Sequence, residues 1–133
     1  VDTAMALFLQ VYNADKNNFE ANNNLGNAYL LKEDYANAIV YYQNALKIDS
    51  KNLDAKSNLS RAYAKNGEYE KAKDSYTELL RMNQKDWDAY IELAKVCIQL
   101  NQNNLAEGYL LTVKEKNPTF KAAEIDSLLE SIK

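Results

Sequence analysis

The chain has 133 residues, an apolar content of 47% and a formal net charge of −3. This is enough apolar material for one domain with a real core, so disorder throughout the chain is excluded. With only three glycines and one proline, the chain has too few turn-forming residues for a β-sandwich or barrel. The composition therefore predicts an all-α protein.

The charge and hydropathy patterns exclude two classes of partner. There is no strongly basic block for a nucleic-acid backbone, and no apolar run approaches the roughly 18 residues that membrane insertion requires. The opening residues carry Asp2 and lack a basic start, so they are not typical of a signal peptide. The chain looks like a piece of something longer, which leaves its compartment unknown. A soluble and weakly cytoplasmic protein is the expectation, with any signal or anchor upstream of residue 1.

Apolar residues recur at helical spacing in eight segments. In chain order, we expect helices near residues 2–14, 20–32, 35–48, 54–66, 69–82, 87–100, 103–116 and 120–131. Gly67 and Asn101 fall at equivalent points between paired helices and tolerate the left-handed conformation that commonly ends a helix. Glu33 occupies the same point earlier in the chain, and we expect it to lower the local stability there.

The sequence matches itself when it is shifted by 34 residues. Small residues recur at Gly26, Ser60 and Ala94, and alanine recurs at Ala38, Ala72 and Ala106. Other apolar positions agree in the same register: Leu25, Leu59 and Leu93; Tyr29, Tyr63 and Cys97; Tyr42, Tyr76 and Leu110. Small residues allow two helices to approach closely, and large ones fill the space between neighbouring copies. The period therefore indicates helical hairpins that pack against copies of themselves.

A period of this length with this pattern resembles the tetratricopeptide repeat family. The resemblance divides one domain, 1–133, into the second helix of a truncated repeat (1–18), three full repeats (19–52, 53–86 and 87–120) and a C-terminal capping helix (121–133). It implies a right-handed superhelical stack of helix-turn-helix hairpins, an alpha-alpha solenoid. The first helix of each hairpin would line its concave side.

The residues needed for catalysis are largely missing. The chain has no histidine, which removes the commonest general base and metal ligand. Cys97 is the only cysteine and replaces a repeat tyrosine, so we interpret it as a packing residue. The carboxylates Glu20, Asp54 and Asp88 recur in first helical turns, where they favour the helix dipole. We therefore predict a protein that is not an enzyme and uses no metal or cofactor.

The concave side is the predicted binding surface, because the resemblance places the first helices there. Spacing of three and four along these helices selects a peptide-binding groove of Asn23, Asn27, Leu30, Ser57, Arg61, Lys65, Ile91, Lys95 and Ile98. Arg61, Lys65 and Lys95 beside Ile91 and Ile98 favour a protein or peptide segment of mixed acidic and apolar character.

One subfamily grips the C-terminal carboxylate of chaperones with a clamp of lysine, two asparagines, lysine and arginine. Asn27 and Asn58 fit its asparagines. Asn23, Asp88 and Glu92 stand where the basic residues belong, and the two acids would repel a carboxylate. A chaperone-tail clamp is therefore not expected.

The N-terminal helix raises an alternative function, that of a structural assembly unit. Its apolar residues are crowded, and we assign Met5, Leu9 and Tyr12 to an assembly surface. Upstream residues, a second copy of the chain or another partner would cover it. Homo-oligomers through this helix are one form of this alternative.

Overall fold

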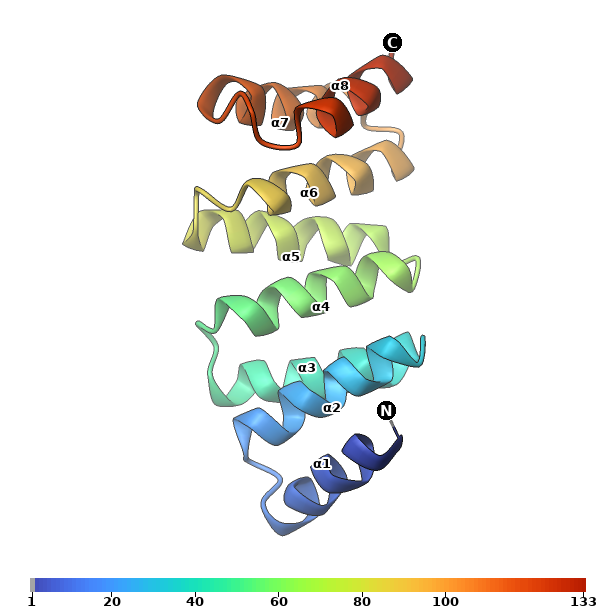
Figure 1. The fold of residues 1–133 in the computed structure, drawn as a ribbon, viewed down its shortest axis with the longest axis vertical. Coiled ribbons are helices and arrows are strands. Elements are labelled where there is room, and N and C mark those ends of the chain that lie inside the picture. Colours follow the sequence, from blue (N-terminus) through green and yellow to red (C-terminus); the bar gives the residue numbers. More distant parts are fainter. Residues whose placement is uncertain (1) are drawn as a thin grey trace. The chain divides into compact units, whose positions relative to one another are not determined.

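The computed structural model describes residues 2–133, and every regular element in that range is an α-helix (Figure 1). In chain order the helices are α1 (Asp2–Ala14), α2 (Phe19–Leu31), α3 (Tyr35–Ile48), α4 (Leu53–Lys65), α5 (Tyr69–Met82), α6 (Trp87–Gln99), α7 (Asn103–Lys116) and α8 (Ala122–Ser131). The all-α prediction is confirmed, and each predicted boundary lies within two residues of the observed one. No helix in this range is both long and apolar enough to cross a bilayer.

The chain divides into two compact units, with α1 to α4 in the first and α5 to α8 in the second. The boundary lies between Glu68 and Tyr69, which is between the two helices of the predicted second repeat. The organisation as one domain of truncated repeat, three full repeats and capping helix stays a prediction.

The first helices of the three repeats begin with the same side-chain cap. Asn18 Oδ1 accepts the N–H of Ala21 at 2.8 Å, and Asn52 Oδ1 accepts that of Ala55 at 3.0 Å. Asp86 caps α6 in the same way, through the Ala89 N–H at 3.1 Å. Because each oxygen satisfies a donor that the helix leaves free, these residues fix where α2, α4 and α6 begin.

The same three helices also end alike. Glu33, Gly67 and Asn101 all have left-handed φ, at 59°, 78° and 60°. Around Glu33, the Asp34 N–H bonds the Tyr29 carbonyl at 2.9 Å and the Glu33 N–H bonds the Leu30 carbonyl at 3.0 Å. This pair of bonds is a Schellman motif. The hydrogen bonds made by the other two turns follow the same pattern.

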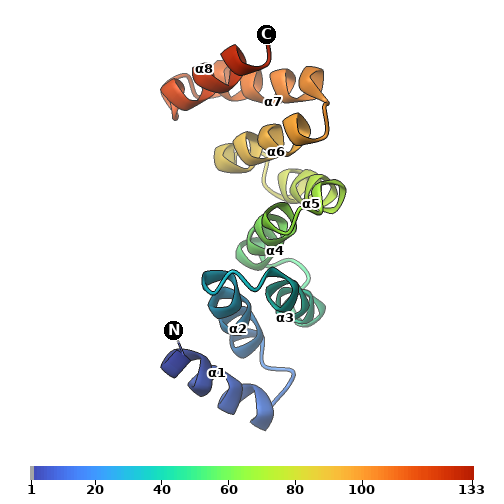
Figure 2. The same cartoon turned by 90° about the vertical axis from the view of Figure 1, so that its right-hand side faces the viewer.

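The core of the first unit consists of two clusters. In one, Met5 of α1 packs with Leu25 and Ala28 of α2, and Figure 2 shows these two helices beside each other. The other cluster joins α3 to α4: Ala38, Ile39, Tyr42, Leu59 and Ala62. The helices α2 and α3 approach closely because Gly26 has no side chain where the Tyr42 ring lies.

The second unit contains the third copy of the pattern. The repeat positions on α6 and α7 are wholly buried: Leu93, Ala94, Cys97, Ala106, Leu110 and Val113 each have 0% exposure. On α8 only Ile125 is buried, at 1% exposure. The helix α8 is therefore held by a much smaller apolar contact than α6 or α7.

Candidate binding surface

The first-helix face of the first unit comprises the predicted groove residues of α2 and α4. These are Asn23, Asn27, Leu30, Ser57, Arg61 and Lys65, and all of them are partly or fully exposed. The spacing that selected them from the sequence therefore identified residues that a partner can reach. Whether a partner binds them stays a prediction.

Asn27 is part of a polar network inside this face. Its Oδ1 accepts a hydrogen bond from the Tyr42 hydroxyl at 2.5 Å and another from Asn58 Nδ2 at 3.3 Å. Burial raises the pKa of the Tyr42 phenol, while the nearby Arg61 charge acts in the opposite direction. The Asn27 oxygen is thus committed to holding α2, α3 and α4 together.

Arg61 and Lys65 supply the positive charge of this face. Both are exposed on α4, and neither makes an ion pair within residues 2–133. Lys95, the third cation of the predicted groove, bonds two carboxylates instead. The two α4 cations can therefore pair with an acidic partner without first breaking an internal contact.

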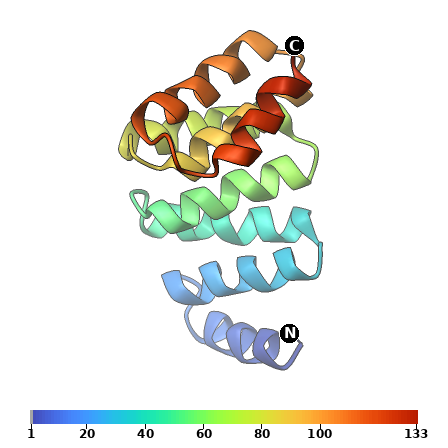
Figure 3. The ribbon, with the colours of Figure 1, turned by 45° about the horizontal axis from the view of Figure 1, so that its top comes forward.

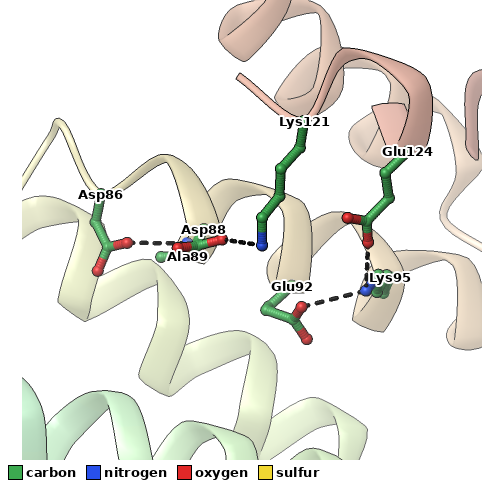
Figure 4. A network of polar contacts seen from close by, with 7 residues as sticks. All are labelled: Asp86, Asp88, Ala89, Glu92, Lys95, Lys121 and Glu124. Carbon is green, nitrogen blue, oxygen red and sulfur yellow. Dashed lines mark hydrogen bonds and ion pairs between the residues drawn. The ribbon is translucent and has the colours of Figure 1, made fainter. Parts of the chain in front are cut away.

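Among the predicted groove residues of the second unit, Ile91 is buried and Lys95 is engaged in ion pairs. Ile91 is 1% exposed, so a ligand cannot touch it in this structure. Lys95 Nζ lies 2.8 Å from Glu124 of α8 and 3.2 Å from Glu92 of its own helix (Figure 4). The Glu124 hydrogen bond is the main cause of the raised pKa of Lys95. Ile98 remains partly exposed.

A second ion pair joins α6 to α8. Lys121 Nζ lies 2.6 Å from Asp88 Oδ1 (Figure 4), and Figure 3 shows α8 in front of α6. The sequence pattern did not predict that α8 and the residue before it would pair with this face. The signal was present, because residue 121 lies one period after Trp87 and the charges of Asp88 and Lys121 are opposite. The absence of a chaperone-tail clamp stays a prediction.

The residues expected to form an assembly surface on α1 lie on the side that packs against α2. Met5 is 7% exposed, and Leu9 and Tyr12 pack against the cluster that it forms with α2. These three residues hold α1 to its neighbours because the stripe that faces α2 takes the larger side chains. The large apolar residues of α1 that are exposed are Leu7 and Val11, at 59% and 47%.

The surroundings of Cys97 favour a packing role over a catalytic one. Cys97 is buried, and burial raises the pKa of its thiol, which disfavours the reactive thiolate. Among the described residues, no group of three or more cysteines or carboxylates is placed to hold a metal ion. Neither result tests the prediction that the chain lacks enzymatic activity.

Models of the tetratricopeptide repeat match most of the chain. One model matches residues 29–76 and again 64–132, and a second matches residues 1–52. Together they include every helix in Figure 1. A search of curated protein sequences finds no match.

Solved structures of low sequence identity share the fold. The crystal structure of MamA is similar over 98% of this chain and 85% of its own, with a TM-score of 0.86 and 21% identity. The first tetratricopeptide repeat domain of Spaghetti, bound to an HSP90 peptide, has a TM-score of 0.77 at 21% identity, covering 86% and 89% of the two chains. The Yersinia enterocolitica secretion chaperone SycD, in complex with a peptide of the translocator YopD, has a TM-score of 0.77 at 23% identity, covering 85% and 90%. The chain thus has the all-α helical-repeat solenoid fold.

Proposed function

Because the chain belongs to the tetratricopeptide repeat family, we propose that it is a non-enzymatic scaffold that binds a segment of another protein on its first-helix faces. Two structural relatives hold peptides, one from HSP90 and one from YopD, which supports a peptide or protein partner here. The lack of histidine and the buried Cys97 thiol support a role without catalysis.

The proposed chemistry of the partner follows from the unpaired cations Arg61 and Lys65. The first-helix face of the first unit also carries the partly exposed side chains of Leu30 and Ser57. The acidic residues of a bound segment would pair with these two cations, and its neighbouring apolar residues would bury apolar area on the same face. A chaperone tail held by its carboxylate is not part of the proposal, since the family's basic clamp positions hold Asn23, Asp88 and Glu92.

Peptide selection with matched charge variants tests this function. Peptides would be selected from a random library on the wild-type chain and then measured on Arg61→Glu/Lys65→Glu. The control is Lys47→Glu/Lys51→Glu, which makes the same change of charge elsewhere in the first unit, at two exposed lysines. We expect peptides rich in acidic and apolar residues whose affinity falls about tenfold or more on the first variant only.

Salt provides a second readout of the same contacts. Affinity for the wild type should fall as salt rises, and the Arg61→Glu/Lys65→Glu variant should lose that dependence. If the selected peptides bind Arg61→Glu/Lys65→Glu and the control variant equally, the first-helix face of the first unit is not the binding site.

A second candidate function is assembly through α1. Val11 is 47% exposed, although its equivalents one and three periods later, Ala45 and Val113, are wholly buried. Asp2 is the only charged residue of α1, so two copies of this helix can meet without charge repulsion. Sedimentation at high concentration should then show a dimer that Leu7→Lys/Val11→Lys abolishes. A strict monomer would count against this function.

A further inference from the structure

The face of α6 that carries Asp88, Ile91 and Lys95 is already occupied by a helix of the same chain. The three residues are spaced by three and four, so they lie on one side of α6. The outer two reach α8, through Lys121 at 2.6 Å and Glu124 at 2.8 Å (Figure 4). Ile91 between them is 1% exposed, and so is Ile125 of α8. Two ion pairs therefore link the two segments, and each helix has a buried aliphatic residue beside its charged ones.

The helix α8 is attached weakly by comparison with its neighbours. It has ten residues, a length that is marginal for an isolated helix. All three of its ion pairs to other helices, including Lys114 to Asp126 at 2.7 Å, join side chains at least 40% exposed, and such pairs contribute little. Ile125 is its only buried residue.

The start of α8 also lacks the device that fixes α2, α4 and α6. Its N-cap residue, Lys121, makes no side-chain cap hydrogen bond. The backbone of Lys121 is left-handed, with φ at 45°, a conformation that is strained for a residue with a side chain. The Lys121 ammonium bonds Asp88 and lies 5.7 Å from the centre of the Phe120 ring. Releasing α8 would relieve this strain.

We propose that α8 is a displaceable resident ligand, and that the α6 face beneath it binds amphipathic helices of partner proteins with the same chemistry. The partner would carry a basic residue, then an acid and an aliphatic residue three and four positions later, as Lys121, Glu124 and Ile125 do. The acid pairs with Lys95, the base pairs with Asp88 and the aliphatic side chain covers Ile91. The partner binds only when α8 leaves.

The inference rests on the proposed function in taking first helices as binding faces, but its test uses a different unit. The probe is a labelled synthetic peptide of residues 119–133, added to the full chain. The opened variant is Ile125→Asp, which places a charge in the buried contact of α8 and leaves α6 unchanged. Hydrogen exchange of the α8 amides reports the opening, and the protection of α6 and α7 reports the fold of the unit.

We expect the peptide to bind the opened variant about tenfold more tightly than the wild type. Removing α8 from the α6 face raises the fraction of molecules in which that face is free to bind. In the wild type, excess peptide should speed exchange in α8 and leave α7 unchanged. A peptide with Glu124→Lys should bind poorly to the opened variant, and Lys95→Glu in that variant should restore its binding. Restored binding by this exchange of charges would distinguish specific recognition from non-specific apolar binding.

Three results would overturn the proposal: α8 amides that stay protected in the opened variant, peptide binding that does not rise on opening, or equal binding of both peptides. If Ile125→Asp also unfolds α6 and α7, Lys121→Ala/Glu124→Ala replaces it, since this variant removes only the ion pairs. If the peptide does not bind the opened variant but Arg61→Glu/Lys65→Glu still weakens the binding of the selected peptides, only the inference about α8 is overturned. Loss of that effect with the peptide still bound would overturn the proposed site in the first unit.

Discussion

At Gly26 the absence of a side chain is what lets α2 and α3 pack. A Cβ added there would lie 2.5 Å from Tyr42 Cε1, closer than such atoms approach in real structures. The Tyr42 ring has little room to move, because it is wholly buried and its hydroxyl bonds Asn27. Gly26→Ala should therefore lower the free energy of unfolding by about 1–2 kcal/mol, even after the gain in helix propensity of about 1 kcal/mol.

Urea unfolding followed by circular dichroism measures this effect, and Gly108→Ala is the matched control. Gly108 lies in α7 with nothing within 4 Å of an added Cβ, so its variant should be stabilised by about 1 kcal/mol. In the third copy, Ala94 and Leu110 replace the Gly26 and Tyr42 pair. Adding Tyr42→Leu to Gly26→Ala should therefore cost less than the sum of the two changes. Equal behaviour of both glycine variants would contradict the steric account.

Glu33 provides a second prediction at the scale of one residue. Its φ of 59° is strained for a residue with a side chain, whereas Gly67 adopts the equivalent conformation without strain. Glu33→Gly should raise the free energy of unfolding by about 1 kcal/mol, and Gly67→Glu should lower it by about the same amount. The two midpoints of urea unfolding should move in opposite directions. Changes of the same sign would mean that side-chain contacts decide the stability of these turns.

At the scale of helices, the asparagine caps give the next prediction. Asn52→Ala removes the acceptor for the Ala55 N–H and should cost about 1 kcal/mol, while Asn52→Asp should keep most of the stability. The control is Asn104→Ala, an exposed change within α7. Thermal unfolding should show a lower midpoint for Asn52→Ala only. A similar loss in the control would attribute the effect to asparagine content in general.

The helices were predictable because independent signals in the sequence agree on where they lie. Apolar periodicity sets the segments, the 34-residue register aligns them, and Gly67 and Asn101 mark the ends of α4 and α6. The caps Asn18, Asn52 and Asp86 were not predicted, since only the acids inside each first turn were assigned to the helix starts. The start of α8 was predicted two residues early, because no cap residue marks it.

The binding surface was less predictable than the helices, because exposure depends on what packs over each helix. In the first unit, all six expected residues of the first-helix face are accessible. In the second, the same spacing selected Ile91, which is buried, and Lys95, which pairs with Glu124 of α8. A spacing rule identifies one side of a helix, but it does not report a second helix placed against that side. Met5 was assigned to a surface for the same reason: its spacing on α1 does not show that α2 packs against it.

At the scale of the whole molecule, the pH dependence of stability follows from which groups titrate. The chain has no histidine, so we expect a flat profile between about pH 6 and 8. Burial raises the pKa of the Cys97 thiol and of the phenols of Tyr41, Tyr42 and Tyr109. A group with a raised pKa stabilises the fold below its unfolded pKa, and this stability is lost as the pH rises past that value. The loss should therefore begin at about pH 9 and steepen above pH 10.

Tyr42→Phe separates the largest of these contributions from the rest. Its lost hydrogen bond to Asn27 should lower the free energy of unfolding by about 1 kcal/mol at pH 7. With no phenol left to ionise at that buried site, the decline from pH 9 to 11 should then be shallower than in the wild type. Urea midpoints across this range measure both effects, with Tyr35→Phe as the control. Parallel declines of wild type and Tyr42→Phe would mean that the Tyr42 phenol does not drive alkaline unfolding.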